Sequence, residues 1–169
     1  RPEEDVRDLA FFPGAVAVVP FLAPAAEDLA AARRLDALLW NHVIDGDLTR
    51  GAMRRALSGE PGCVEELVRA AETDVRTTGR YYVLRYEMTS ASGTSMLAVR
   101  TNDSYGLSAE VAVLAVEAVL NGTVSEGLHS AASVLERENG VLLDRLRSSP
   151  FVTSVEESDG SATVEEGLL

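Results

Sequence analysis

The stretch GRYYVLRYEMTSASGTSMLAVRT, residues 79–101, decides the fold class. Its first half is aromatic and β-branched, a Ser-Ala-Ser-Gly turn follows at 90–93, and apolar alternation then resumes. This pattern predicts a β-hairpin. Successive side chains of a strand point to opposite faces. One face of the first strand therefore carries Tyr82, Leu84, Tyr86 and Met88. The other carries Tyr81, Val83, Arg85 and Glu87.

The second strand ends in Arg100, and the polar turn 101–106 leads into an alanine-rich segment. We expect Ser108 to cap a helix there and Gly122 to end it. Its predicted inward stripe comprises Val111, Leu114, Ala115, Ala118 and Val119. A helical pair over 130–147, interrupted at Asn139-Gly140, and short strands at 151–155 and 162–164 complete this half.

Residues 1–75 read mainly as helix. Residues 16–19 predict a short buried strand, and the apolar residues of 25–43 fall on one helical stripe. Thr49 is expected to cap a short helix, and Pro61 to open another. The inward residues predicted for that last helix are Val64, Leu67, Val68 and Ala71. Helices mainly on one face of an antiparallel or mixed sheet with a central hairpin define an α+β fold. We expect one domain over 1–157 and an acidic edge strand or tail over 158–169.

The composition restricts the classes of function. The chain has 169 residues and a formal net charge of −12, and all of its 15 Lys and Arg residues are arginine. The negative charge argues against nucleic acid as a partner, because neutralising phosphates needs clustered cations. The lack of lysine excludes a Schiff-base lysine in this chain. The most apolar segment, 11–26, is interrupted by prolines and too short to span a membrane, so we expect a cytoplasmic protein.

The turn after the second strand carries the best candidate site. Arg100 offers a guanidinium that can hold a carboxylate through two parallel hydrogen bonds. The N–H groups at the start of the next helix also favour anions. Tyr105 adds a hydroxyl and an apolar ring, and Gly106 permits close approach of a backbone or a ligand. In the structural alternative, Arg100 pairs with Glu87 across the hairpin and Tyr105 packs in the core.

Other chemistry is sparse. His129 follows Gly127 in a turn and is either a weaker ligand contact or an exposed loop histidine. His42, Asp45 and Asp47 form a trio of possible metal ligands, but they lie where the helix should end, and a terminal histidine interacts well with the helix dipole. We therefore predict no specific divalent metal there. No Gly-x-Gly-x-x-Gly sequence follows a strand, so we expect no cofactor to be bound by this chain.

The order of these features resembles a known family. A hairpin, an arginine-bearing strand, a Tyr-Gly turn and an alanine-rich helix ending at Asn121-Gly122 precede GTVSEGLHSAASVLERENGVLLDRL, residues 122–146, and a further strand. Over about 78–157, this order is similar to the carboxy-terminal part of the saccharopine dehydrogenase-like oxidoreductases. In that family a similar helix ends in a glycine turn, and a second glycine, here Gly127, follows shortly after.

The resemblance implies a substrate-binding and dimerisation domain with an α+β fold. In the family a separate Rossmann domain binds NAD(P), and the pair carries out hydride chemistry on an imine that joins two amino-acid-like halves. The chain would then contact a small carboxylate-bearing molecule and a second copy, and would be catalytically silent alone. Arg100 would hold the carboxylate, Tyr105 and Gly106 would shape the pocket wall, and His129 would be a further contact.

Two alternatives stay open. One is a non-enzymatic α+β module that binds a small ligand or a protein, and the other is a small stand-alone enzyme that uses His42 and its neighbouring aspartates. We also predict a homodimer, because the first hairpin strand is apolar on both faces and one layer of helices cannot cover both. The predicted interface includes some of Tyr81, Val83 and Leu97.

Overall fold

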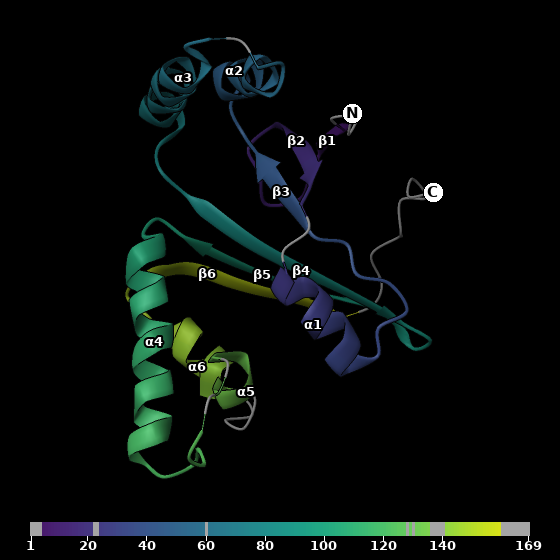
Figure 1. The fold of residues 1–169 in the computed structure, drawn as a ribbon, viewed down its shortest axis with the longest axis vertical. Helices are drawn as coiled ribbons and strands as arrows, with labels where there is room; N and C mark the ends of the chain where they lie inside the picture. The colour runs from purple at the N-terminus through teal and green to yellow at the C-terminus, as the bar shows by residue number, and fades with distance from the viewer. Residues whose placement is uncertain are drawn as a thin grey trace. The chain divides into compact units, whose positions relative to one another are not determined.

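The computed structural model describes residues 5–21, 24–59, 61–127, 129, 131–135 and 141–159. Each of the two sheets is three-stranded and antiparallel, and helices accompany both (Figure 1), which confirms the α+β class. Internal contacts divide the chain into two compact units, Arg1–Arg80 and Tyr81–Leu169. The sequence pattern, which favours one domain over 1–157, does not indicate this division.

The first unit contains a small sheet with the strand order β1-β2-β3. The edge strands β1 (Asp5–Asp8) and β3 (Asn41–Ile44) pair antiparallel with the central β2 (Ala15–Pro20). β2 confirms the strand predicted at 16–19, and its Val16, Ala17 and Val18 are buried. The central strand thus supplies the apolar core of this sheet.

The helix predicted over 25–43 is wrong in its second half, since α1 covers only Pro24–Arg33. Arg34 has a φ of 51°, the left-handed conformation in which many helices end. Residues 41–44 instead form β3, where His42 pairs with Val19 and Val43 with Val18. Backbone pairing with a buried strand therefore outweighs the apolar spacing that favoured a helix.

The helices α2 (Asp47–Leu57) and α3 (Cys63–Thr78) pack against each other. Ala52 of α2 is fully buried. Arg55 Nη2 donates to Glu66 Oε1 across the pair at 2.5 Å. This hydrogen bond is the main cause of a lowered pKa at Glu66.

The predicted inward stripe of α3 is only partly correct. Leu67 and Ala71 are half-buried, whereas Val64 and Val68 are 64% and 53% exposed. Two polar residues of α3 contact α2, Glu66 through Arg55 and Asp74 through Thr49. These two contacts orient α3 and leave the valines in solvent.

The second unit is built on β4 (Tyr82–Ser90), β5 (Gly93–Thr101) and β6 (Val152–Asp159), in the order β4-β5-β6. β4 and β5 form the predicted hairpin, joined at residues 91–92. The register aligns Tyr86 with Leu97 and Leu97 with Glu157, so these three residues share one face. Leu97 therefore lies with Tyr86, and the predicted interface was wrong to group it with Val83.

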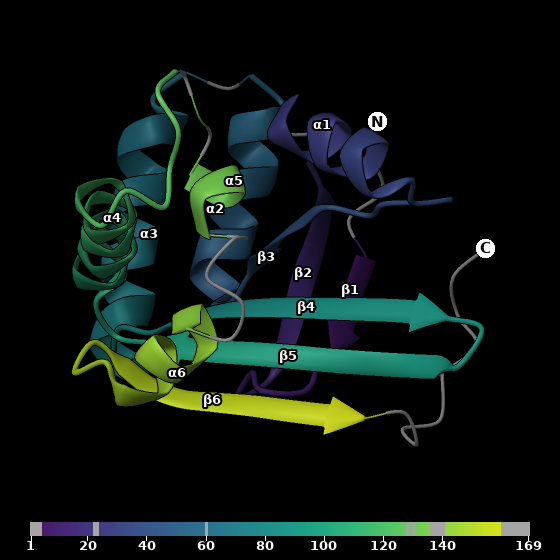
Figure 2. The same cartoon turned by 90° about the horizontal axis from the view of Figure 1, so that it is seen from below.

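Three helices belong to this unit: α4 (Ser104–Leu120), α5 (Ala131–Leu135) and α6 (Val141–Ser148). They gather near the end of the sheet where β5 leads into α4, while the β4–β5 turn lies at the opposite end (Figures 1 and 2). Arg147 of α6 forms an ion pair with Glu157, which places α6 on the sheet face that carries Tyr86. The buried apolar residues of these helices are Leu107, Leu114, Ala118 and Val134.

The start of α4 differs from the prediction, and its end agrees. Ser108 does not cap the helix but lies inside it, and its Oγ donates to the Ser104 carbonyl at 2.8 Å. Asn121 is the C-cap, followed by Gly122 with a φ of 69°. The inward stripe is correct at Leu114 and Ala118, half-buried at Val111 and Ala115, and wrong at Val119, which is 57% exposed.

β6 covers most of the strand predicted at 151–155 and continues to Asp159, into the predicted acidic tail. The rest of that tail, the strand predicted at 162–164 and the Asn139-Gly140 interruption lie outside the described residues. Within the described part of the chain, no helix combines the length and hydropathy that a bilayer crossing requires.

Candidate functional site

The turn between β5 and α4 is held by its own side chains. Thr101 is almost completely buried, and its Oγ1 donates to the Phe151 carbonyl at 2.5 Å while accepting from the Asp103 N–H at 2.9 Å. Asp103 is the N-cap of α4, and its Oδ1 accepts from the Gly106 N–H at 2.9 Å. The turn is thus tied both to the helix start and to the segment before β6.

Gly106 is crowded by an aromatic side chain. A Cβ added there would lie 2.3 Å from Phe151 Cδ1, closer than any real contact allows. The close approach predicted at this glycine therefore exists, and the group that approaches is the Phe151 ring. No local sequence pattern indicates this pairing, because Phe151 lies far along the chain from Gly106.

Arg100 lies on β5, opposite Val83 on β4 and Ser154 on β6. Its guanidinium carbon is 4.5 Å from the centroid of the Tyr81 ring, a distance typical of a cation–π contact. The alternative pairing with Glu87 is not observed, since Glu87 binds Arg85 on its own strand at 2.6 Å. Tyr81 is thus a neighbour of Arg100 that the sequence analysis missed.

The other predicted site residues have different surroundings. Tyr105 is 86% exposed, so it is not the core wedge of the structural alternative. His129 lies in the loop after α4, with its Nε2 2.8 Å from the Ser125 carbonyl oxygen. At the start of α4, the Asp103 carboxylate already places negative charge where an anion was expected to bind.

Two hollows are lined by described residues of the second unit. One, of about 140 Å³, lies among α4, α5 and α6, and its wall includes Leu114, Glu117, Leu135 and Leu142. The other is an open depression lined by Ala109, Glu110, Val113, Arg145, Pro150 and Phe151. Three of their charged side chains are already bonded, since Arg145 donates to Glu117 at 2.9 Å and Glu110 accepts from Ser149. None of the four predicted site residues lines either hollow.

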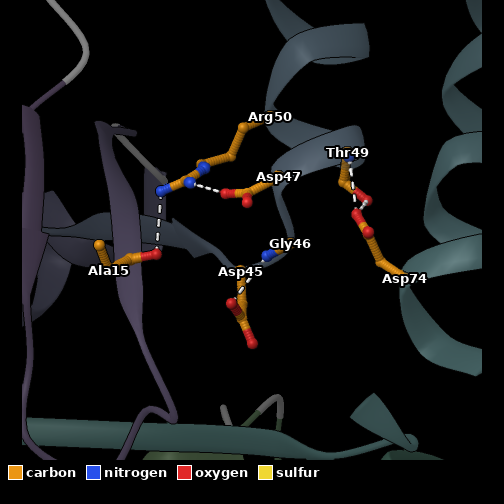
Figure 3. A network of polar contacts seen from close by, with 7 residues as sticks. All are labelled: Ala15, Asp45, Gly46, Asp47, Thr49, Arg50 and Asp74. Atoms are coloured by element: carbon orange, nitrogen blue, oxygen red, sulfur yellow. Dashed lines mark hydrogen bonds and ion pairs between the residues drawn. The ribbon is translucent and has the colours of Figure 1, made fainter. Parts of the chain in front are cut away.

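In the first unit, the aspartates near His42 serve α2 and its approach (Figure 3). Asp45 Oδ1 accepts from the Gly46 N–H at 2.7 Å, and Asp47 forms an ion pair with Arg50. Arg50 Nη1 also donates to the Ala15 carbonyl at 2.9 Å, which ties α2 to β2. These bonds engage both aspartates of the trio in local structure.

His42 itself lies on β3, so the explanation by helix-end capping was wrong. It is exposed, and its ring centroid lies 4.3 Å from that of Phe21. Among the described residues, no group of three His, Cys, Asp or Glu side chains is arranged to hold a metal ion. The prediction of no metal at this trio remains a prediction, with a physical basis in the bonds of Asp45 and Asp47.

Thr49, predicted to cap α2, instead receives a cap from another helix. Asp74 Oδ2 on α3 accepts from both the N–H and the Oγ1 of Thr49, at 2.8 and 2.7 Å. The N-cap position is Gly46, which has a φ of 93° and no side chain to offer. A carboxylate from a neighbouring helix thus satisfies the first turn of α2.

No family model matches this sequence, and neither a curated protein nor a solved structure matches it. The relationship to the saccharopine dehydrogenase-like oxidoreductases stays a prediction that rests on the residues quoted for it.

Proposed function

We propose that the second unit is the substrate-binding and dimerisation domain of a saccharopine dehydrogenase-like, NAD(P)-dependent oxidoreductase. The observation that supports this most directly is the agreement between the residues that the resemblance covers and the bounds of a compact unit. The resemblance covers about residues 78–157, and this segment coincides with the compact unit that starts at Tyr81 and whose described part ends at Asp159. The hairpin, the capped helix and the returning strand belong to one body, as the resemblance requires.

Arg100 is the group we propose for the substrate carboxylate. The guanidinium carbon of Arg100 lies 4.5 Å from the centroid of the Tyr81 ring, and this cation–π contact would hold the arginine side chain in position for a ligand. An arginine fork can bind a carboxylate through two parallel hydrogen bonds. The substrate carboxylate would bind the guanidinium in this way, and Tyr105 and His129 would contribute only if the substrate extends beyond the sheet.

The nucleotide would be held elsewhere. The chain has no Gly-x-Gly-x-x-Gly turn between a strand and a helix, which is the element that cradles a pyrophosphate. We therefore propose that NAD(P) binds to a separate Rossmann domain and that this chain supplies substrate contacts in the cytoplasm.

One observation favours the alternative of a non-enzymatic interaction module. The second unit exposes large apolar side chains on β4, among them Tyr86 at 51% and Met88 at 71%. Such a surface fits a protein partner regardless of any chemistry at Arg100. The two functions differ in what Arg100 does, and this difference is measurable.

The test is an NMR titration of the isotope-labelled chain with glutamate, an amino acid with two carboxylates, and separately with NADH. We expect glutamate to shift the Arg100 Nε–H signal and NADH to leave the spectrum unchanged. Arg100→Gln should weaken glutamate binding by roughly tenfold or more, because a charge-assisted bidentate pair is lost. Arg145→Gln, which removes an arginine bound to Glu117, is the matched control and should bind as the wild type does.

The substrate-binding role would be contradicted if glutamate shifted no signal, or if its binding survived Arg100→Gln. The interaction module would then be the better-supported function. Binding of NADH to this chain would contradict the proposed division between two domains.

A further inference from the structure

The edge strand β4 carries an unusual surface. Among the described residues β4 pairs only with β5, and within that part of the chain its other side is an open edge. The side chains on the sheet face shared with Leu97 are apolar or aromatic, and their exposed fractions are 42% at Tyr82, 45% at Leu84, 51% at Tyr86 and 71% at Met88. Natural proteins normally protect an open edge with charges, proline or a covering segment. An open edge beside an exposed apolar row indicates a partner strand.

The charges of β4 are arranged symmetrically about its middle. The strand has nine residues, Tyr82–Ser90, and its central residue is Tyr86. Its only charged residues are Arg85 and Glu87, one on each side of Tyr86 and both on the face opposite the apolar row. Within the chain they bind each other at 2.6 Å. A sequence that reads plus, tyrosine, minus is complementary to itself when it is reversed.

We infer that the partner is a second copy of this chain, which pairs its β4 antiparallel with the first across a two-fold axis at Tyr86. The axis stands perpendicular to the sheet, so the two apolar rows lie on the same side of a continuous six-stranded sheet. Arg85 then faces Glu87 of the second copy, and Glu87 faces the second Arg85. Leu84 faces Met88 of the second copy, and Tyr82 faces Ser90.

The charges select this register. An axis at Arg85 would place two guanidinium groups opposite each other, and an axis at Glu87 would place two carboxylates there. Like charges directly opposite are destabilising in a sheet, and opposite charges are stabilising. The central register also pairs all nine residues of β4, from Tyr82 to Ser90, whereas any shift leaves strand ends unpaired.

The net charge of −12 per chain opposes association only weakly. β4 itself is neutral, because Arg85 and Glu87 cancel. Exposed charges farther than about 8 Å apart are largely screened at physiological salt. The inference deepens the dimerisation part of the proposed function, on which it rests, and it moves the interface from the predicted face of Val83 to the β4 edge and the row of Tyr86.

The experiment is analytical ultracentrifugation across the micromolar range with two charge reversals, Arg85→Glu and Glu87→Arg. The wild type should sediment as a dimer of 18.0 kDa chains. Each reversal alone turns two attractive cross-strand pairs into repulsive ones, and the dissociation constant should rise by roughly tenfold or more. An equal mixture of the two variants should form a heterodimer as tight as the wild type, because carboxylates on one chain then face guanidinium groups on the other.

The mixture isolates the contact between chains, because each variant still carries a like-charged pair within its own strand. Circular dichroism melts establish that both variants are folded. If either fails to fold, the chain with both reversals replaces them: its internal pair is restored, and it should dimerise with itself but not with the wild type. Glu72→Arg and Arg76→Glu, which reverse an exposed pair on α3, are the matched controls and should leave association unchanged.

The outcomes separate the inference from the proposed function. A wild type that remains monomeric overturns both the β4 pairing and the dimerisation role. A dimer that is insensitive to both reversals overturns the β4 pairing alone. Failure of two folded variants to form a heterodimer overturns the register at Tyr86.

Discussion

Two helices of this protein, α2 in the first unit and α4 in the second, have a crowded glycine near their start: Gly46 is the N-cap of α2, and Gly106 lies in the first turn of α4. A Cβ at Gly46 would lie 2.3 Å from Asp74 Oδ2, and one at Gly106 would lie 2.3 Å from Phe151 Cδ1. The crowding group is a carboxylate in the first case and a phenyl ring in the second. The missing side chain therefore leaves room for a carboxylate in the first unit and for an aromatic ring in the second.

The two helices also differ in what satisfies their first N–H groups. α4 uses its own N-cap, Asp103, whose carboxylate reaches the Gly106 N–H within the same turn. α2 uses Asp74 of α3, which is 25 residues away from Thr49 in the sequence. The comparison shows that one helix start is encoded locally and the other depends on a tertiary contact. Substitutions at the two starts should therefore differ in size.

The largest effect is expected for Gly46→Ala. Alanine would have to adopt a φ of 93°, and its Cβ would meet the Cβ of Asp74 at 2.9 Å as well as the carboxylate. Backbone strain and overpacking each cost about 1–3 kcal/mol, so we expect the free energy of unfolding to fall by about 3 kcal/mol. Urea denaturation followed by circular dichroism measures it.

Gly59→Ala is the matched control, because Gly59 has a φ of 79° and no atom within 4 Å of an added Cβ. It should cost about 1–2 kcal/mol, the strain alone. Equal losses for the two variants would show that Asp74 does not clamp the start of α2.

The next effect compares the two carboxylates. Asp74→Ala removes two hydrogen bonds to Thr49, at 2.8 and 2.7 Å, and should lower the stability of α2 by about 2 kcal/mol. Asp103→Ala removes one capping bond and should lower that of α4 by about 1 kcal/mol. Amide hydrogen exchange resolves the two helices separately.

Asp103→Ser preserves an N-cap oxygen and should retain most of the protection of α4. No single cap residue can replace Asp74, because Gly46 occupies the N-cap position and has no side chain. The comparison between local and tertiary capping fails if Asp103→Ala destabilises its helix more than Asp74→Ala does.

The second unit was the more predictable from sequence, because its signals are local. The hairpin follows from alternation on either side of a Ser-Ala-Ser-Gly turn, and Gly122 ends α4 as expected. The prediction of Ser108 as the N-cap was wrong, although the correct residue could be found in the sequence. Asp103 lies directly before the helix, and aspartate is a favoured N-cap residue. The contact of Phe151 with Gly106 had no local signal at all.

The first unit was less predictable, because its strands are defined by their partners. β1 has the polar sequence DVRD, and β3 has the sequence NHVI inside a longer apolar period that suits a helix. Pairing with the buried β2 decides both. For the candidate site, the sequence predicted Arg100 as a carboxylate-binding residue and Gly106 as a point of close approach, whereas their neighbours Tyr81 and Phe151 are apparent only in three dimensions.

The smallest effect concerns Gly51 and Gly106, two glycines that lie inside helices and differ in how closely other atoms surround them. Gly51 lies inside α2, and a Cβ there would meet nothing closer than Arg55 Nη1 at 3.8 Å. Gly51→Ala should therefore raise the free energy of unfolding by up to about 1 kcal/mol, the difference in helix propensity between alanine and glycine. Gly106→Ala gains the same propensity but forces the Phe151 ring aside, at a cost of about 1–3 kcal/mol, so its net effect should be a loss. In a Phe151→Ala background that loss should turn into a gain, because the ring is gone. Thermal melts of Gly51→Ala, Gly106→Ala, Phe151→Ala and the Gly106→Ala/Phe151→Ala double variant test this prediction. A stabilised Gly106→Ala chain would contradict it, because the Phe151 ring would then move aside without cost and would not restrict the start of α4.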